Sequence, residues 1–327
     1  MAHNLAETNG RTAMAYYGEA PWHRLGTELA SPATAADAIE AAGLGYDVEL
    51  TGLETVDGIP VPQGRAVVRT DSNEVIGVVG NVYVPMQNRE CFGFLDAIVA
   101  EGGLRYHTAG ALGQGERIWL LAKLPDQIRV LNSEDVVDKF LLLSNTHDGS
   151  AALRVYFTPI RVVCQNTLNM AEARARGQGI SILHKGDLAS KIREAQRVLG
   201  LAERFYDDAA AKIDLLAGFH PSEEQLTTYF ETLYPDPANS ENRRAKNIRQ
   251  KMLELFEKGI GQDMPEIRGT AWAAFNAVTE YVDHVRPTRG ASEQVRDSKR
   301  LDSAWFGSGA KLKSQAWEIA VQLAAAN

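Results

Sequence analysis

The stretch "SNTHDGSAALRVYFTPIRVVCQNTL", residues 144–168, decides the predicted fold of this chain. An apolar run ends at its first residue, and apolar side chains then recur at every second position over 153–157, the period of a half-buried strand. Between the two runs stands "NTHDGS", whose Asp-Gly pair is typical of tight hairpin turns. The stretch therefore predicts two antiparallel strands, with His147 and Asp148 in the turn that joins them.

The chain changes character after this hairpin. Residues 158–175 are expected to pass from strand to helix, with the helix running from Cys164 and capped by Asn166 or Thr167. Residues 187–218 place apolar side chains three and four positions apart, which predicts one long amphipathic helix. Further helical patterns follow over residues 220–235, with Ser222 as the N-cap, and over 242–261, 269–285 and 308–326.

Ahead of the hairpin, helix-forming and strand-forming segments are joined by short turns. Helices are predicted over residues 33–43 and 89–103, the second ended by Gly102-Gly103. Strands are predicted within 46–56, 65–71, 104–125 and 126–146, and two short strands within 74–88. Strands joined by short turns pair antiparallel, so the predicted class is α+β: a curled antiparallel sheet with flanking helices, then a mostly helical C-terminal half. We expect an irregular N-terminal arm over 1–30, a sheet domain over 31–163 and a helical region over 164–327 packed on the sheet.

The composition is that of a soluble globular protein. Of 327 residues, 45% are hydrophobic and 23% are charged, and the apolar runs are too short to cross a bilayer. The N-terminus shows no secretory signal pattern. The two cysteines, Cys91 and Cys164, are too few for a disulfide framework, so we expect a cytoplasmic protein with no membrane partner.

The net charge of -8 is unevenly distributed along the chain. Residues 1–100 contain 5 Lys/Arg against 13 Asp/Glu, whereas residues 161–204 contain 8 against 4 and residues 286–313 contain 7 against 3. Solvated helix faces explain such basic stretches, and so does a cationic groove for nucleic acid. The acidic total weighs against nucleic acid, and the two basic stretches weigh in its favour.

The polar residues of the opening stretch offer two catalytic arrangements. Cys164 and His147 would form a nucleophile and its base, or His147 and Asp148 would bind a metal together with His184 and His284. However, no HxxxH, HExxH or CxxC spacing places two ligands on one surface. A turn and a helix cap explain the same residues, so we predict no metal site and no cofactor.

A second polar set lies on the predicted helix 269–285. Asn276, Glu280 and His284 are four positions apart and therefore share one helical face. Glu280 beside His284 would suit a general base, although polar pairs at this spacing are common on helices. The glycines of "GALGQGE" stand between strands and indicate no phosphate-binding loop.

The segment "RLDSAWFGSGAKLKSQAW", residues 300–317, points more directly to nucleic acid. Trp305 and Phe306 precede a glycine-bearing stretch of backbone. Three cations flank them: Arg300, Lys311 and Lys313. Aromatic rings stack on bases and cations neutralise phosphates, the two requirements of single-stranded nucleic-acid binding. Tryptophans that anchor this segment onto the helical region explain the aromatics as well.

Five ordered motifs resemble one known family. They are "PWHRLG" (21–26), "VYVPMQN" (82–88), "HTAGALGQGERIWLLAKLP" (107–125), "THDGSAALRVYFTPIRVVCQNTL" (146–168) and "GTAWAAFNAVTEYVDH" (269–284). Over nearly the whole chain they resemble the phage- and plasmid-borne protein family catalogued as domain of unknown function 932. The resemblance implies a mobile genetic element and a bacterial host cytoplasm, and it brings no settled activity.

The predicted architecture is also similar, at the level of fold alone, to the core of Rad52-like single-strand annealing proteins, which hold unwound DNA in a cationic groove. The matching parts are the hairpin at 140–158, the helix from Cys164 and a basic stretch. That stretch contains Lys185, Lys191, Arg193 and Arg197. The acidic first hundred residues depart from the pattern, and a fold analogy alone carries no function.

We therefore predict a non-enzymatic protein that binds or anneals single-stranded DNA in phage recombination or replication, as a homo-oligomer. The predicted DNA-binding residues are Arg161, Lys185, Lys191, Arg193, Arg197, Arg300, Trp305, Phe306, Lys311 and Lys313. Two alternatives stay open: an interaction protein that binds a host or phage factor through its acidic face, and a metal-assisted hydrolase of nucleic acid or nucleotides. The hydrolase would use His147, Asp148 and His284.

Overall fold

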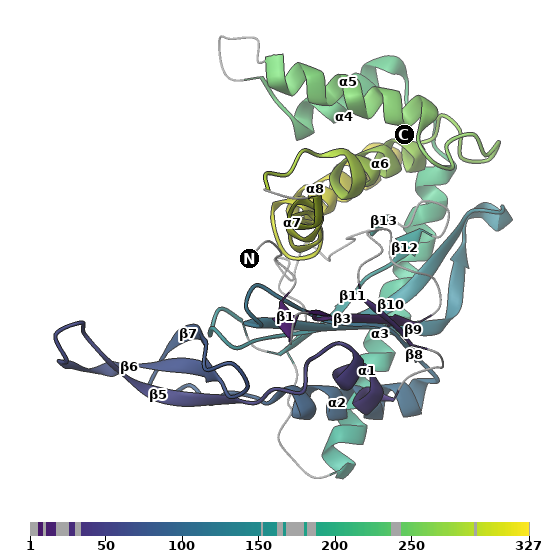
Figure 1. Ribbon diagram of the computed structural model, residues 1–327. Coiled ribbons are helices and arrows are strands. Elements are labelled where there is room, and N and C mark those ends of the chain that lie inside the picture. The colour runs from purple at the N-terminus through teal and green to yellow at the C-terminus, as the bar shows by residue number, and fades with distance from the viewer. Residues whose placement is uncertain are drawn as a thin grey trace.

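The structure is a computed structural model, and three parts make up its fold. They are a central sheet, a three-stranded projection that we call the β-wing (residues 48–84), and helices on both sides of the sheet (Figure 1). This mixed arrangement confirms the predicted α+β class. The structure describes residues 6–8, 11–17, 26–29, 34–151, 153–161, 166–167, 180–181, 188–236, 243–290 and 293–326.

Among the described residues, the central sheet has nine strands, and the predicted hairpin is formed by two of them, β10 and β11. The strands are β3 (Met14–Tyr17), β4 (Thr27–Leu29), β8 (Arg105–Leu112), β9 (Arg117–Arg129), β10 (Val136–Thr146), β11 (Arg154–Phe157), β12 (Ile160–Arg161), β13 (Asn166–Thr167) and β14 (Ile180–Ser181). Their path is β13-β12-β10-β9-β8-β3-β4, with β11 pairing to β10 and β14. Strands β10 and β11 pair antiparallel, with Leu142 opposite Tyr156, and Gly149 takes φ 76° in the turn. A separate ladder joins β1 (Glu7–Thr8) to β2 (Arg11–Thr12).

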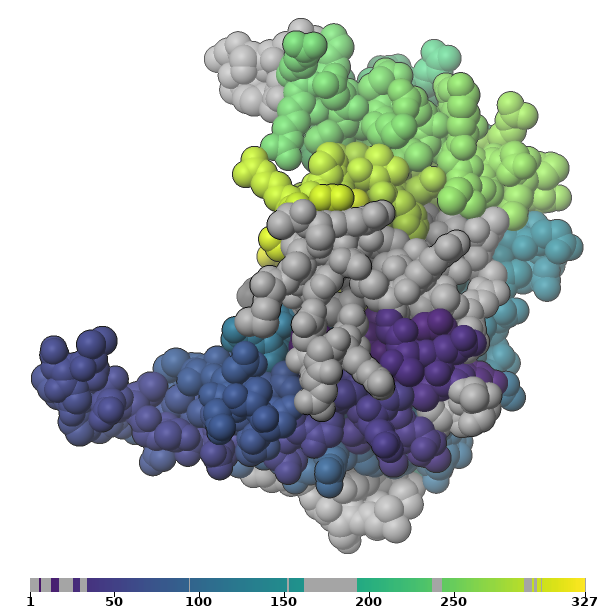
Figure 2. Space-filling view, in the orientation of Figure 1, coloured from purple at the N-terminus to yellow at the C-terminus, as the bar shows by residue number. Residues whose placement is uncertain are grey.

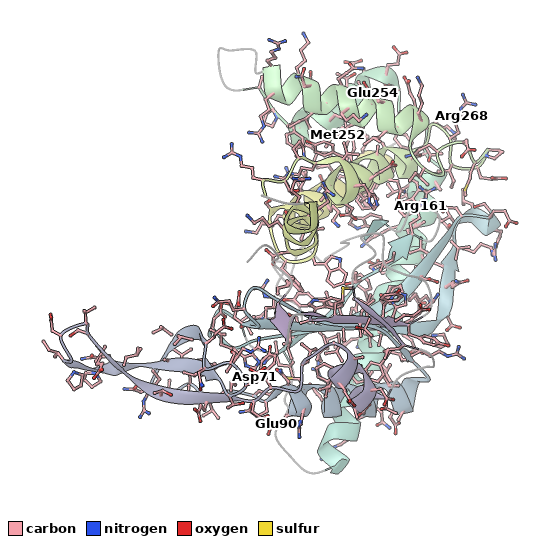
Figure 3. All side chains as sticks on the ribbon, viewed as in Figure 1. Asp71, Glu90, Arg161, Met252, Glu254 and Arg268 are labelled. Carbon is pink, nitrogen blue, oxygen red and sulfur yellow. The ribbon has the colours of Figure 1, made fainter. Side chains whose placement is uncertain are left out.

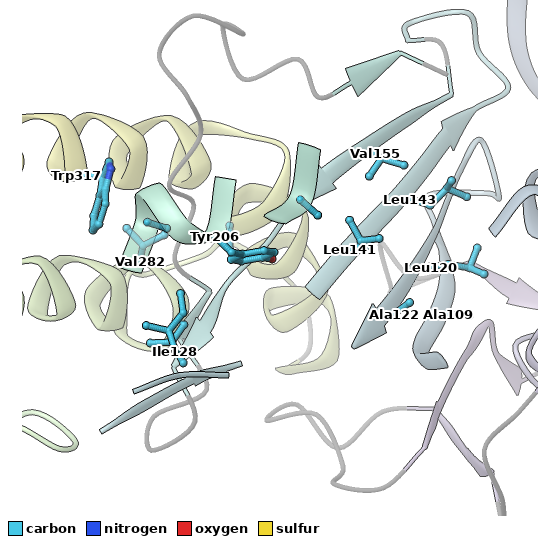
Figure 4. Close-up of a cluster of buried hydrophobic side chains, with 14 of the residues drawn as sticks. Ala109, Leu120, Ala122, Ile128, Leu141, Leu143, Val155, Tyr206, Val282 and Trp317 are labelled. Atoms are coloured by element: carbon cyan, nitrogen blue, oxygen red, sulfur yellow. The ribbon is translucent and has the colours of Figure 1, made fainter. Parts of the chain in front are cut away.

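Alternation along β9 and β10 gives the sheet two apolar faces. Leu120, Leu141 and Leu143 point into the main core, which the helices complete with residues such as Tyr206 (Figure 4). The Tyr206 hydroxyl donates to the carbonyl of Phe140 (2.6 Å) and accepts from its N–H (2.9 Å). That pair of bonds joins the helical region to β10 at the point where a bulge interrupts its pairing with β9.

The helices surround the sheet, and the longest of them connects the two sides. They are α1 (Ala35–Ala41), α2 (Asn88–Gly102), α3 (Leu188–Ala217), α4 (Glu223–Leu233), α5 (Arg243–Lys258), α6 (Ala271–Glu280), α7 (Glu293–Trp305) and α8 (Ser308–Ala325). Helices α1 and α2 lie on one side and α4–α8 on the other, while α3 runs past the sheet (Figure 1). Gln196 of α3 donates to Glu101 (3.2 Å), and Asp214, near its other end, accepts from the N–H of Leu131 (2.9 Å).

Local signals set several helix ends as predicted. Gly103 takes a left-handed φ of 62° after α2, a conformation that a side chain would oppose. Ser222 caps α4 by accepting from the N–H of Gln225 (3.2 Å). The long helix predicted over 187–218 is confirmed as α3.

The β-wing consists of β5 (Val48–Glu54), β6 (Pro60–Arg69) and β7 (Val75–Gly80), paired antiparallel in that order. Its base is fixed to the body by side chains. The Gln87 side chain accepts from the N–H of Val48 and donates to its carbonyl, both at 2.9 Å. The Tyr83 hydroxyl donates to the carbonyl of Thr146 in the central sheet (3.2 Å). These bonds hold the base of the wing on the body, while its tip extends well away from the body (Figure 2).

Two strand predictions in the first half need correction. The N-terminal arm, predicted as irregular, contributes β3 and β4, because pairing of β3 with β8 covers an otherwise open sheet edge and buries Met14 and Ala15. Only one strand, β7, forms within 74–88. The segment after it leaves the sheet, and its Tyr83 side chain holds the wing base instead.

The helix expected from Cys164 is wrong at residues 166–167. Asn166 and Thr167 form strand β13, with Thr167 opposite Ile160 of β12. Both residues are good helix caps. Pairing with the edge of β12 satisfies their backbone groups as well, so only the tertiary fold decides between a cap and a strand. Cys164 itself lies outside the described residues. In the described part of the chain, no helix has the length and apolar character needed to cross a membrane.

Candidate nucleic-acid interface

The corner between α7 and α8 packs on the second face of the central sheet. That face carries an apolar cluster of its own: Met14, Leu112, Trp119, Leu121, Phe140 and Leu142. Trp305 and Phe306, which end α7, lie against this cluster. The two aromatics predicted to stack on DNA bases therefore fix the C-terminal helices to the sheet.

Ring contacts hold this corner in place. The Trp305 ring stands edge-on to Trp119 with 5.0 Å between centroids, and Phe306 stands edge-on to Tyr156 at 6.0 Å. The Arg117 guanidinium lies over the Phe306 ring, 4.8 Å from its centroid, and pairs with Asp302 at 3.4 Å. Burial raises the pKa of Asp302, and Arg117 opposes that rise. Sequence patterns gave no signal for Arg117 or Tyr156, because their approach to α7 is a long-range contact.

Cations gather around the solvent side of this corner. Six basic residues fall within 286–311: Arg286, Arg289, Arg296, Lys299, Arg300 and Lys311. Arg289, Lys299 and Lys311 are exposed, and the others are half-buried. The loop before α7 folds back along it, because Thr288 donates to the carbonyl of Arg296 (2.9 Å). Arg286 reaches Ser308 in the first turn of α8 (3.3 Å), so the loop, α7 and the start of α8 form one surface.

Arg161, predicted as a phosphate contact, is instead buried completely. Its Nε donates to both carboxylate oxygens of Asp135, at 2.8 and 2.9 Å, and neither side chain is exposed. Trp272 Nε1 also donates to Asp135 (2.8 Å), and an Arg161 terminal nitrogen donates to the carbonyl of Gly261 (3.0 Å). These groups lie where the sheet meets the helical region, near the Arg161 label in Figure 3. We call them the helix junction.

Lys313 is likewise a core residue. It is fully enclosed and pairs with Asp283 at 2.7 Å, which joins α8 to the π-helical turn after α6. Burial lowers the pKa of Lys313, and Asp283 counters that effect. The prediction that Arg161 and Lys313 contact phosphates is therefore wrong, because a buried, ion-paired cation offers nothing to a ligand at the surface.

The remaining predicted cations do not all join the α7 surface. Arg193 and Arg197 are exposed on α3, and Arg197 pairs with Glu194 of its own helix (2.7 Å). Helix α3 packs against α2 and the core, whereas α7 belongs to the group of helices above the sheet (Figure 1). Lys185 lies outside the described residues, as does the Lys191 side chain. Among the predicted cations whose side chains the structure describes, only Arg300 and Lys311 join Trp305 and Phe306 at one place.

His147 and Asp148 form a structural junction rather than a catalytic pair. His147 is fully buried, and its Nε2 donates to Asn88 Oδ1 (2.8 Å), an assignment fixed because Asn88 Nδ2 donates to the carbonyl of Leu44 (2.9 Å). Among the described residues, His147 Nδ1 has no hydrogen-bond partner. Burial lowers the pKa of His147 to about 4, so the ring is neutral at pH 7. The backbone of Asp148 lies directly under Gly77 of the β-wing.

The same junction holds an aromatic and an arginine. The Arg69 guanidinium lies 3.9 Å from the centroid of the Tyr46 ring and donates to the carbonyl of Gln114 (2.8 Å). Arg69 also pairs with Asp71 at the rim, at 2.7 Å. We call this set, with His147 and Asn88, the wing junction.

The second candidate set lies on α6 and in the turn after it, and two of its side chains make hydrogen bonds that stabilise the fold. Glu280 accepts from the N–H of Ile260 (3.1 Å), and burial raises the pKa of its carboxyl. Asn276 donates to the carbonyl of Trp272 one turn earlier (2.8 Å). His284 follows in the π-helical turn Tyr281–Val285 and is half-buried. In the part of the chain that the structure describes, no three His, Cys, Asp or Glu side chains are grouped to hold a metal ion.

The family model described as domain of unknown function (DUF932) matches residues 75–305. This chain belongs to the DUF932 family. It is also similar to UPF0380 protein YfjQ of Escherichia coli (strain K12), with 35% identity over 77 residues. That match covers 23% of this chain and 27% of the relative, so the chain spans about a quarter of the length of that relative. No solved structure matches this DUF932 protein, and the analogy to Rad52-like proteins stays a prediction.

Proposed function

We propose that this DUF932 protein binds single-stranded DNA without catalysis, on the surface formed by α7, the loop before it and the first turn of α8. One observation supports this: residues 286–311 carry six Lys/Arg against three Asp/Glu, in a chain whose net charge is -8. A cationic patch on an acidic protein attracts a polyanion locally while the acidic remainder repels it. The family resemblance supports a mobile genetic element in a bacterial cytoplasm as the setting, and we propose phage recombination or replication as the process.

The binding energy would come mainly from phosphate neutralisation. Arg289, Lys299 and Lys311 are exposed and lie on the loop, on α7 and in the first turn of α8, and we propose that one strand contacts all three. Each neutralised phosphate releases condensed counterions, and affinity for single strands falls with salt by about 0.7 log units per contact per decade. Binding by this surface is therefore independent of base sequence and weakens steeply as salt rises.

The aromatic residues have a different role from the one predicted. Trp305 and Phe306 turn toward the sheet, where their rings meet Trp119 and Tyr156. We assign them to positioning: they fix the end of α7, so that its cations are presented on a rigid support. Base stacking on these two rings is not part of the proposal.

Fluorescence anisotropy with a labelled 30-nucleotide strand tests the proposal. The variant Arg289→Gln/Lys299→Gln/Lys311→Gln should weaken binding at least ~10-fold at low salt and reduce the salt slope by about 2, the loss of three contacts. The matched control Arg193→Gln/Arg197→Gln/Arg204→Gln on α3 makes the same charge change and should bind like the parent. No binding by the parent at low salt, or a loss confined to the α3 variant, would refute the proposal.

The competing functions differ in what supports them. A metal-assisted hydrolase would need His147, Asp148 and His284, and the structure engages the first two in the wing junction. An interaction protein has more support, because the β-wing is acidic and exposes apolar side chains. We also propose that the protein self-associates, and the surface responsible is the subject of the next inference.

A further inference from the structure

Exposed apolar side chains concentrate on the β-wing. Among the described residues, nine large apolar side chains are exposed to water. Six of them lie on the wing: Val56, Ile59, Val75, Val78, Val82 and Val84. Val56 is fully exposed at the tip, and Val82 is 95% exposed. Such a concentration on one projecting element is typical of a protein-binding surface, because water disfavours a contiguous apolar patch.

The wing is also acidic where it meets water. Residues 48–84 contain five Asp/Glu and two Lys/Arg, and one of the two cations, Arg69, is buried in the wing junction. Glu54 and Asp57 flank Val56 at the tip and are exposed. Nucleic acid and anionic lipid surfaces would repel such a tip. The chemistry therefore calls for a protein partner with a basic surface.

The chain carries such a surface on α5. Its first nine residues, 243–251, contain five Lys/Arg and no Asp/Glu. Arg243, Arg244 and Lys246 in the first turn are exposed, and we call them the basic end of α5. Cations at a helix N-terminus oppose the helix dipole, which favours acidic groups at that end. Acidic side chains brought to the basic end would be attracted by its three exposed cations.

The two surfaces cannot meet within one molecule. The wing tip projects at the lower left of the molecule, whereas α5 lies at the top (Figures 1 and 2). Gln87, Tyr83 and the wing junction hold the base of the wing on the body, away from α5. Complementary surfaces at separate places on a rigid chain join copies head to tail.

We propose that the tip of the β-wing docks on the basic end of α5 of a second copy of this chain. Glu54 and Asp57 pair with Arg243, Arg244 and Lys246 of the neighbour. Val56 and Ile59 pack on the aliphatic stems of those long cations, which cover apolar surface while their charged ends stay in water. The contact leaves the α7 surface open, so self-association and DNA binding are separable.

Sedimentation velocity of the full chain without DNA, over a range of protein and salt concentrations, tests this contact. The parent should form species larger than a monomer that dissociate as salt rises. Either charge reversal, Glu54→Lys/Asp57→Lys or Arg243→Glu/Arg244→Glu, should raise the apparent dissociation constant at least ~10-fold. The control reversal Glu203→Lys/Asp207→Lys, on exposed positions of α3, should leave it unchanged.

The decisive step combines the two reversals. A chain that carries both, or an equal mixture of the two variants, should regain association, because the charges are complementary again. A separate variant, Val56→Ser/Ile59→Ser, should weaken association without changing charge, and Leu215→Ser, at an exposed apolar position of α3, should not. A monomeric parent at all concentrations, association indifferent to the tip reversal, or failure of the combined reversal to restore it would each overturn the proposal.

Discussion

The β-wing and the helical region are both attached to the central sheet, but by different chemistry. The helix junction encloses a complete ion pair, in which Asp135 accepts from Arg161 and Trp272 with no exposure to water. The wing junction encloses a neutral histidine, His147, and leaves its ion pair, Arg69 with Asp71, at the rim. The first junction depends on a buried ion pair, whereas the second depends on a histidine ring that stays neutral.

The largest expected effect comes from breaking the helix junction. Asp135→Ala leaves Arg161 as an uncompensated buried charge and should destabilise the protein by about 3–5 kcal/mol, measured by urea unfolding. Asp126→Ala, at an exposed position of β9, is the matched control and should change little. The double variant Asp135→Leu/Arg161→Met should lose less stability than Asp135→Ala, because it leaves no charge buried without a partner. Equal losses in both variants would show that the ion pair is not what the junction depends on.

The next effect tests the wing junction through pH. The folded pKa of His147 is about 4 and the unfolded value is about 6.5, so the unfolded chain binds more protons between these values. Stability should therefore fall as pH drops from 6.5 toward 4, by about 3 kcal/mol from this residue. Burial also lowers the pKa of His107 to about 4. His107 should therefore lower the stability further over the same pH range.

Urea unfolding of the parent, of His147→Gln and of His220→Gln at a series of pH values isolates that contribution. The pH dependence should flatten in His147→Gln, since glutamine does not titrate, and persist in His220→Gln, whose side chain is exposed. An unchanged pH slope in His147→Gln would contradict the assignment.

The smallest effect is expected from a variant that tests how closely the β-wing packs on the β10–β11 hairpin. A Cβ at Gly77 would stand 2.6 Å from Asp148 Cα, so Gly77→Ala must move one backbone against the other and should cost about 1–3 kcal/mol. Gly80→Ala, on the same strand, meets nothing within 4 Å and should cost far less. Thermal unfolding of the two variants measures the difference, and equal midpoints would mean that the wing is not packed on the hairpin.

Local patterns in the sequence predicted the elements well. The β10–β11 hairpin, α3 and the Ser222 cap all depend on residues within a few positions of one another, where periodicity and turn chemistry act directly. The prediction failed where a distant partner decided the outcome. Thr167 became part of a strand because β12 offered an unpaired edge, and β3 formed because β8 did the same.

The candidate site was likewise predictable in part from the sequence and in part only from the tertiary structure. The sequence by itself determined that the chain is an α+β protein with an acidic first third, cationic stretches and an aromatic pair at 305–306, because composition and spacing carry that information. Only the tertiary structure decided that Arg161 and Lys313 are core ion pairs while Lys299 and Lys311 face water. The reason is physical: a cation's role depends on whether a buried carboxylate reaches it, and those carboxylates lie 26 and 30 positions away along the chain.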